Sequence, residues 1–543
     1  MISSSIEPLE ARIAPATIIS ATTVTFQDID GDNVTIKVSK PIFTDDLTAA
    51  NLIDFTGSIF TDGGPQQLNA LFLQNLGAAN NGLDVSITAK RSPITGGNGE
   101  VAFNSLDASG VDGITGLGTG IDLGKVFVQG DANSLDAGDG DAATPAIKSL
   151  DIRSIGAALN ADQSDIFGSI TKAKIRGSMQ GKLIIRAGPG DPLLAGIGSL
   201  FVGGDIGAFN GAGGVVDVVG GIGTLTVKGS LVGGSVSGSG IIFAGKGIKT
   251  LTIAGSMIGG SAMNTGNVAT LGRLETATIG GSLHGSENST AEISAGSMGK
   301  VKIGHDVTGG AGIGSGKINS AFGMGGIDSL TIGGSLVGGG GSGSGRVQMG
   351  DGTVTIGGSI VGGGDTEAGV LTAGSLKSLV IKGDIIGGSS ERSGHVFSNG
   401  MIKSMTVGGS VRGQSVVADR QAFVATIFAV EGIESLTING DFLAGNIIAG
   451  IEKNGDQYGD GNDMDLNPGV TAKIGKLIIK GRASGSSATS NPLDHYGIEA
   501  NEIGTLTVGG ITFKNGDPSP GGPLSFASGF LLGTSGDLLV KIL

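Results

Sequence analysis

The chain has no cysteine and no tryptophan, and only 2 of its 543 residues are tyrosine. Without cysteine there is no disulfide framework, no thiolate metal site and no cysteine nucleophile. The aromatic share of 4% weighs against carbohydrate-binding clefts and nucleic-acid stacking platforms, because both depend on aromatic faces. The net charge of −14 disfavours nucleic acid and anionic membrane surfaces as partners.

Long apolar runs are also missing, so we expect no transmembrane segment. Residues 1–18 lack the basic and apolar regions of an ordinary secretory signal, and we interpret them as a sorting or tail segment. Glycine, in contrast, is abundant, with 107 residues, while hydrophobic residues still reach 39%. The chain is therefore glycine-rich without having the composition of a disordered protein.

A repeat of about 25 residues organises most of the chain. It is clearest in the segments that start at Ile222, Ile248, Ile327 and Leu376, and weaker copies bring the total to about 15 over residues 119–511. Each copy holds three short runs in which apolar and polar residues alternate. This period-two pattern indicates strands.

Glycines separate these runs. Because glycine takes positive φ without a steric penalty, we expect it as the corner residue. Three strands and three corners close one coil, and coils stacked about 4.8 Å apart pair each strand in parallel with its copies. The predicted fold is all-β: a right-handed parallel β-solenoid, or three-sided β-helix.

A serine or aspartate recurs after the first strand of each coil, and we interpret it as a turn residue. The residues at this position are Ser230, Ser256, Ser282, Asp306, Ser335, Ser359, Asp384, Ser410 and Asp441.

The two ends depart from the repeat. Residues 19–118 predict a small β-rich N-terminal domain or cap, with a hairpin turn at 30–33, a short helix within 45–55 and a strand at 82–90. Residues 512–543 predict a C-terminal cap. Its last strand either caps its own solenoid, which we favour, or pairs with a neighbouring molecule.

An acidic insertion at 451–469 interrupts the array. Its oxygen-bearing side chains stand at short intervals on a glycine-rich loop, which suits Ca²⁺. They are Asp456, Asp460, Asn462, Asp463 and Asp465. The spacing matches no complete EF-hand loop, so a solvated acidic loop is the simpler interpretation and a Ca²⁺ site is the alternative. We expect no other cofactor.

Two further acidic groups are weaker candidates. Asp28, Asp30 and Asp32 also fit a plain hairpin turn, and a third group comprises Asp131, Asp136, Asp139 and Asp141. Among the four histidines, only His305 beside Asp306 suggests chemistry, and it stands at a regular corner. No nucleophile-elbow, phosphate-loop or zinc-protease motif occurs, so we expect no enzymatic activity.

The N-terminal sequence SIEPLEARIAPA resembles the LEPR- or LEARIAP-type motif of large exported, glycine-rich β-solenoid repeat proteins of Verrucomicrobia and Planctomycetes. The segment FQDIDGDNVTIKVSK is similar to one that often follows this motif. The resemblance implies export to the bacterial cell surface or the extracellular space. It implies no particular activity.

These observations predict a secreted structural protein of the cell surface or extracellular matrix. It would self-associate into a filament or coat, or bind components of the cell envelope. Two alternatives remain open: a surface adhesin that binds a ligand or Ca²⁺ through the acidic insertion, and a polysaccharide-degrading β-helix enzyme.

Overall fold

The computed structural model describes residues 15–109, 120–141, 143–156, 163–186, 195–207, 211, 213–320, 325–390, 392–413, 425–454, 458–459, 462–486, 495–514 and 529–543. They fall into two compact units. Unit 1 comprises Met1–Gly229 and Phe243–Lys246, and unit 2 comprises Ser230–Ile242 and Gly247–Leu543. Residues 1–14, which hold most of the SIEPLEARIAPA motif, lie outside the described residues.

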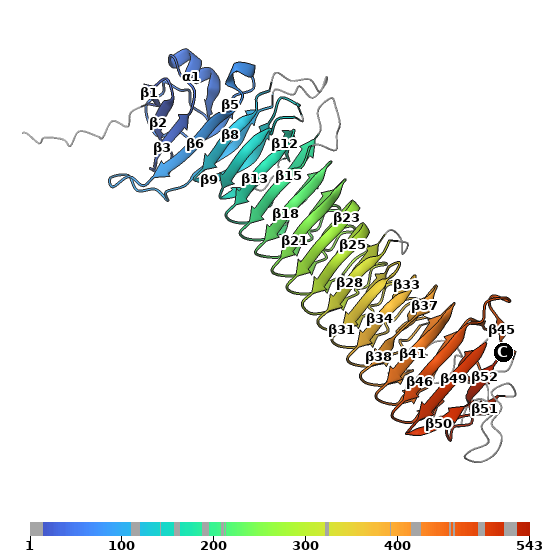
Figure 1. The fold of residues 1–543 in the computed structure, drawn as a ribbon. Helices are drawn as coiled ribbons and strands as arrows, with labels where there is room; N and C mark the ends of the chain where they lie inside the picture. Colours follow the sequence, from blue (N-terminus) through green and yellow to red (C-terminus); the bar gives the residue numbers. More distant parts are fainter. Residues whose placement is uncertain are drawn as a thin grey trace, which may run out of the picture. The chain divides into compact units, whose positions relative to one another are not determined.

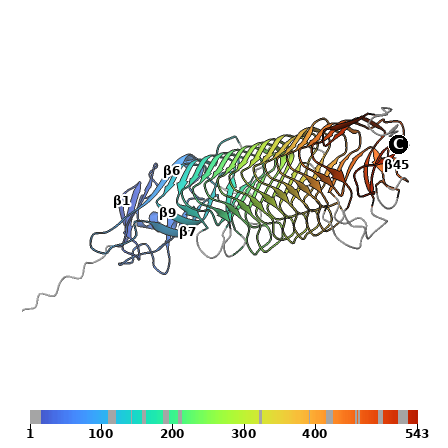
Figure 2. The ribbon, with the colours of Figure 1, turned by 90° about the horizontal axis from the view of Figure 1, so that it is seen from below.

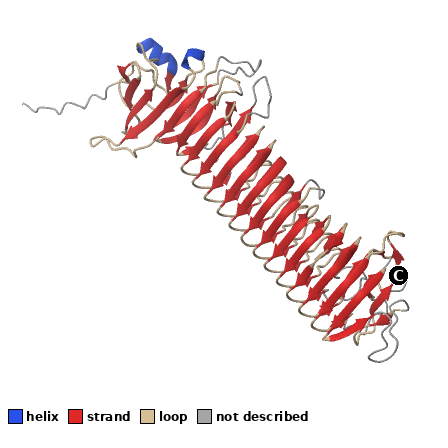
Figure 3. Cartoon of the chain, in the orientation of Figure 1, coloured by secondary structure: helices blue, strands red, loops and turns tan. Residues whose placement is uncertain are grey.

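Parallel stacked coils form a β-solenoid of about 13 turns, with about 26 residues in each turn. Only 2% of the chain is helical, and Figure 3 shows the helical segments within the N-terminal part of unit 1. The predicted all-β solenoid is therefore confirmed.

Unit 1 begins with antiparallel strands. β1 (Thr17–Ser20), β2 (Thr23–Gln27) and β3 (Asn33–Val38) pair in order, and β3 then pairs antiparallel with β6 (Leu83–Lys90). The predicted hairpin and the strand at 82–90 are thus present. The predicted helix is α1 (Asp46–Leu52), and it begins where the Asp45 carboxylate accepts the Thr48 N–H at 2.8 Å, as an N-cap does.

Parallel pairing in unit 1 starts with the pairs β5–β7 and β6–β8. After β6, the strands of one face are β8 (Leu123–Val128), β10 (Ile147–Ile152), β13 (Ile170–Ile175), β15 (Ile197–Val202) and β18 (Gly221–Val227). The facing strands are β5 (Leu68–Phe72), β7 (Val101–Ala108), β9 (Gly130–Ala137), β12 (Gln163–Phe167), β14 (Lys182–Arg186) and β17 (Val215–Val218). The remaining short elements are β4 (Ile53–Phe55), η1 (Ala78–Asn80), β11 (Ser154–Ile155) and β16 (Ile206–Gly207), while β20 (Ile241–Ala244) has residues in both units.

In unit 2 each coil has three faces, as predicted. The first face carries the most regular strands, which lie side by side in Figure 1. They are β21 (Gly247–Ile253), β23 (Asn267–Ile279), β25 (Glu292–Ile303), β28 (Ile327–Ile332), β31 (Gly352–Ile356), β34 (Leu376–Ile381), β37 (Met401–Ile402), β38 (Met405–Val407), β41 (Gly432–Ile438), β46 (Lys473–Ile479) and β49 (Glu502–Val508).

The second face of unit 2 is built from strands of two residues each. They are β19 (Leu231–Val232), β22 (Met257–Ile258), β24 (Leu283–His284), β26 (Val307–Thr308), β29 (Leu336–Val337), β32 (Ile360–Val361), β35 (Ile385–Ile386), β39 (Val411–Arg412), β42 (Phe442–Leu443) and β47 (Ala483–Ser484). The coils of unit 2 repeat regularly in Figure 2.

The third face of unit 2 includes the first halves of β23 and β25, which continue around the corner onto the first face. Its other strands are β27 (Lys317–Ser320), β30 (Arg346–Gln348), β33 (Leu371–Ala373), β36 (Val396–Ser398), β40 (Ala425–Ala429), β43 (Gly445–Ala449), β48 (Tyr496–Ala500) and β52 (Leu538–Ile542).

The core of unit 2 consists of columns of equivalent apolar residues. Ile253 pairs with Ile279 and Ile279 with Ile303, and this column continues through the following coils to Ile479. The side chains at both ends of the column are 0% exposed. Burying each one contributes about 1.5–3 kcal/mol, a gain that a coil achieves only when its neighbours cover it.

One predicted copy is displaced by a residue. The repeat pattern aligns IDSLTIGG (327–334) with DGTVTIGG (351–358), which places Asp351 opposite Ile327. In the structure Ile327 pairs with Gly352, and the register shifts between Ile327 and Leu330, so that Leu330 pairs with Val354 as the pattern predicts. The strand GTVTI is one residue shorter than its neighbours, so an irregularity restores the alignment of the buried columns.

A ladder of side-chain hydrogen bonds runs along the corner between the first and second faces. Asp306 Oδ1 accepts the backbone N–H of Ser335 at 2.7 Å, and Ser335 Oγ accepts that of Ser359 at 3.0 Å. Nine such bonds connect Ser230 to Arg482. We interpreted these serines and aspartates as turn residues. Their side chains in fact bond to the backbone of the neighbouring coil, so they also hold the coils together.

Glycine is needed at this corner because the backbones of neighbouring coils approach closely. The sequence analysis expected these corner glycines to have positive φ, and this expectation is wrong. Gly333 is not among the positive-φ glycines of the described residues. A Cβ on Gly333 would lie 2.1 Å from the carbonyl oxygen of Gly304 in the preceding coil. Positive φ occurs instead at the corner before the third face, where Gly345 has φ +59°.

A buried hydroxyl closes the loop before the third face, and the sequence analysis did not predict it. Ser315 Oγ donates to the Gly312 carbonyl at 2.8 Å and accepts the Gly310 N–H at 2.8 Å. Equivalent hydroxyl side chains are 0% exposed at Ser239, Thr265, Thr290, Ser315, Ser344 and Ser393. Because an unpaired buried hydroxyl is costly, this double hydrogen bond favours one loop geometry.

The C-terminal strands close the end of unit 2. β52 pairs in parallel with β48 and antiparallel with β51 (Phe530–Leu531). β50 (Ile511–Lys514) folds back antiparallel on β49. The last strand thus caps its own chain, which is the alternative we favoured.

We predict that Gly333→Ala lowers the thermal unfolding midpoint, because its Cβ would overlap the Gly304 carbonyl oxygen 2.1 Å away. Overpacking of this kind costs about 1–3 kcal/mol. Gly340→Ala is the matched control in the same coil, since its nearest neighbour would be 3.9 Å from the new Cβ. Equal midpoints for the two variants would contradict the proposed crowding.

Ala291 has φ +52°, although glycine stands at the equivalent position of neighbouring coils. A left-handed conformation costs a residue with a Cβ roughly 1–2 kcal/mol, so we predict that Ala291→Gly raises the unfolding midpoint. Ala295→Gly, within strand β25, should lower it because glycine weakens a strand interior. A lower midpoint for Ala291→Gly would contradict the strain.

Candidate functional site

The acidic insertion is only partly described. Within it, β44 (Ile451–Glu452) and β45 (Met464–Asp465) form a short antiparallel pair. Asp456 and Asp460, two of the predicted Ca²⁺ ligands, lie outside the described residues. Asn462, Asp463 and Asp465 are described.

The described part of the insertion packs on the outside of the third face of unit 2. Phe428, Ile448 and Ile451 form a buried apolar cluster, against which Tyr458 and the neighbouring hydrophobic residues pack. The rings of Phe428 and Phe397 stack with centroids 5.0 Å apart. Ile451, Tyr458 and Leu466 of the insertion therefore cover apolar side chains that would otherwise face water, while Asn462 and Met464 are exposed.

The described members of the predicted Ca²⁺ set have different environments. Asp463 is 4% exposed, and its Oδ2 accepts the Gly459 N–H at 2.9 Å. Asp465 is half-buried and accepts the Asn467 N–H at 3.1 Å, whereas Asn462 is exposed. Among the described residues, neither aspartate belongs to a group of three acidic side chains with converging oxygens.

A second buried carboxylate lies in this region and was missed in the sequence. Glu499 stands on β48 and is 0% exposed. Burial raises the pKa of the Tyr458 hydroxyl, and the charges of Asp463 and Glu499 raise it further. The only sequence signal for Glu499 is a charged residue at an outward strand position, which is ordinary unless another segment covers that face.

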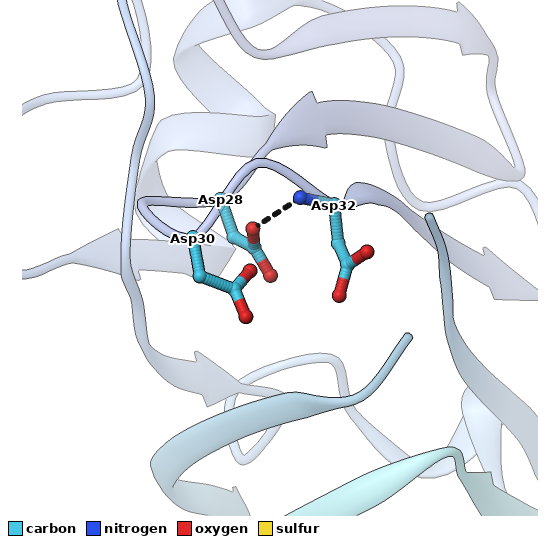
Figure 4. A group of neighbouring side chains, drawn as sticks. All are labelled: Asp28, Asp30 and Asp32. Atoms are coloured by element: carbon cyan, nitrogen blue, oxygen red, sulfur yellow. Dashed lines mark hydrogen bonds between the residues drawn. The ribbon is translucent and has the colours of Figure 1, made fainter. Parts of the chain in front are cut away.

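The converging carboxylates lie instead in unit 1, at the hairpin between β2 and β3. One oxygen each of Asp28, Asp30 and Asp32 lies within 4.8 Å of the others. Figure 4 shows the three carboxyl groups turned toward one another. Asp28 and Asp32 are buried, and Asp30 is exposed.

Backbone hydrogen bonds hold two of these carboxylates in place. Asp28 Oδ1 accepts the N–H groups of Gly31 at 3.0 Å and Asp32 at 2.7 Å. Asp32 Oδ2 accepts the Gly99 N–H at 2.6 Å, so the hairpin is joined to the loop between β6 and β7.

The electrostatics of this hairpin are unfavourable for three charged carboxylates. Burial raises the pKa of Asp28 to about 7, with further contributions from a hydrogen bond to Asp30 and from the charges of Asp30 and Asp32. The same hydrogen bond lowers the pKa of Asp30. An uncompensated negative charge on Asp28 is therefore unfavourable.

The third acidic group is divided among separate structural contacts. Asp131 forms an ion pair with Arg153, and Asp136 accepts the Asp165 N–H at 2.7 Å. Asp139 accepts from the side chain of Asn81 at 2.9 Å. Asp306, the neighbour of His305, is a member of the corner ladder. These contacts support structural roles for Asp131, Asp136, Asp139 and Asp306.

Comparison with protein-family models, with curated proteins and with solved structures finds no match to this chain. Among the described residues, no helix is long and apolar enough to cross a membrane.

We predict that Phe428→Ala releases the insertion from the third face. The Phe428 ring is 8% exposed, so its loss should lower the stability of this packing by about 3 kcal/mol. Trypsin should then cleave at Lys453 faster. Ile313→Ala is the control, because Ile313 is 63% exposed. An unchanged cleavage rate in Phe428→Ala would contradict the packing of the insertion on this face.

Proposed function

We propose that this chain is a secreted structural protein of the cell surface or extracellular matrix that assembles side by side into fibres or a coat. In this proposal the solenoid acts mechanically, as a stiff spacer that presents the same polar surface many times. It performs no catalysis.

The observation that carries the proposal is the corner ladder of unit 2. Nine hydrogen bonds along one corner add to the parallel strand pairs and hold the coils in register. At about 4.8 Å per coil, the stack in unit 2 extends over roughly 40 Å. A ladder of this kind resists bending because every coil would have to lose the same bonds.

The regularity of the coils also supports a structural role. A catalytic site requires side chains that differ from those of neighbouring coils, gathered on one face. The corner Ser and Asp side chains, the most regular polar groups of the repeat, are occupied by bonds to the next coil. Their hydrogen bonds therefore serve stacking.

The form of the ends favours side-by-side assembly. The C-terminal edge of unit 2 is covered by the antiparallel strands β50 and β51. The N-terminal edge of unit 1 is covered by β1, β2 and β3. Antiparallel caps interrupt parallel stacking, so a second molecule cannot continue the coils by simple strand addition.

We expect the purified chain to form filaments or sheets as its concentration rises, visible by negative-stain electron microscopy. Antibody labelling should detect it on intact cells without permeabilisation. Ile511→Lys provides a control for end-to-end contact, because Ile511 is 51% exposed on the edge strand β50. Side-by-side assembly should survive this change.

Three results would contradict the proposal. A chain that stays monomeric at all concentrations would exclude self-assembly, and labelling confined to permeabilised cells would exclude the surface location. Loss of filaments in folded Ile511→Lys would show that assembly occurs through the ends.

A further inference from the structure

We propose that the hairpin carboxylates of Asp28, Asp30 and Asp32 bind one Ca²⁺ ion, which fastens the N-terminal cap to the loop between β6 and β7. The site lies wholly within unit 1. It is independent of the structural function proposed above, and it lies far along the sequence from the acidic insertion.

The first observation is the convergence of the three side chains. Their oxygens lie within 4.8 Å of one another, a separation that one ion can bridge at the Ca–O distance of about 2.3–2.6 Å. The residues alternate along the turn as Asp-Ile-Asp-Gly-Asp. This places three hard oxygen ligands on one side of a short backbone loop.

The second observation is the environment of Asp32. Its side chain is 0% exposed, and its Oδ1 atom has no hydrogen-bond partner among the described residues. A buried carboxylate oxygen without a partner is strongly unfavourable. A cation between the three carboxylates would supply the missing interaction.

Among the described residues, no basic side chain forms an ion pair with these three carboxylates. The ion pairs among the described residues include none of Asp28, Asp30 and Asp32. Arg91, a basic residue preceding the covering loop, donates to the Asn98 carbonyl at 3.0 Å instead.

The loop between β6 and β7 packs closely on the Asp32 carboxylate. A Cβ on Gly97 would lie 1.9 Å from Asp32 Oδ1. The loop also donates the Gly99 N–H to Asp32 Oδ2 at 2.6 Å. An ion held by Asp32 would therefore stabilise both the hairpin and the loop that packs on it.

The ligand chemistry favours Ca²⁺ over Mg²⁺. The three carboxylates come from one irregular turn, two buried and one exposed, and Ca²⁺ accepts irregular oxygen geometry with 6–8 ligands. Mg²⁺ demands a near-octahedral arrangement and gives up its water reluctantly. Water would complete the Ca²⁺ shell on the exposed side of Asp30.

The test is calorimetric titration of Ca²⁺ into the full chain after treatment with a chelator. We expect Asp30→Asn to weaken Ca²⁺ binding at this site at least tenfold. Asp30 is exposed, so this variant should keep its fold. Asp32→Asn should have the same effect, and Asp46→Asn, an exposed acidic residue of α1, controls for the loss of one charge.

Hydrogen exchange gives a second readout. Ca²⁺ should slow the exchange of amides in residues 92–100 of the unchanged chain and of Asp46→Asn, but not of Asp30→Asn. Asp463→Asn identifies any contribution of the insertion and should leave both effects intact.

Three outcomes would overturn the proposal. They are undiminished Ca²⁺ binding in folded Asp30→Asn and Asp32→Asn, binding that disappears only in Asp463→Asn, and no change in the exchange of residues 92–100. Equal affinity for Mg²⁺ would overturn the assignment to Ca²⁺.

Discussion

The close stacking of corner backbones is the constraint on which the rest of unit 2 depends. Parallel strands lie about 4.8 Å apart, so every corner must repeat at this distance without side-chain clashes. Gly333 meets this requirement, because a Cβ there would touch the carbonyl of Gly304. The following Ser335 accepts the next backbone N–H, so the tight corner also satisfies its polar groups.

This constraint explains why a chain so rich in glycine still folds with a well-packed core. Glycine is confined largely to corners and loops, and the strands between them carry Leu, Ile and Val in columns with almost no exposure. The second face needs only two residues per strand because its corners are fixed by the ladder on one side. The buried hydroxyls, such as Ser315, fix the loop on the other side.

The departures from the repeat lie where other segments contact the coils. Phe397, Phe428 and Ile448 stand at successive outward positions of the third face, and the insertion covers them. At the N-terminus the hairpin of β2 and β3 contacts the loop between β6 and β7 through Asp32. Both contacts bury carboxylates, so the acidic side chains of this chain do more than maintain solubility.

The sequence by itself determined the strand pattern, the coil length and the register of most copies, because period-two alternation and repeat spacing are local properties. It also identified Asp28, Asp30 and Asp32 as a candidate group, since they stand within five residues. Only the tertiary structure decided the reason for the corner glycines, the burial of Glu499 and the cover over Asp32. Each of these depends on atoms from another coil or loop, which no local pattern reveals. For the same reason the displaced copy at Gly352 was visible only once its strand was paired with its neighbours.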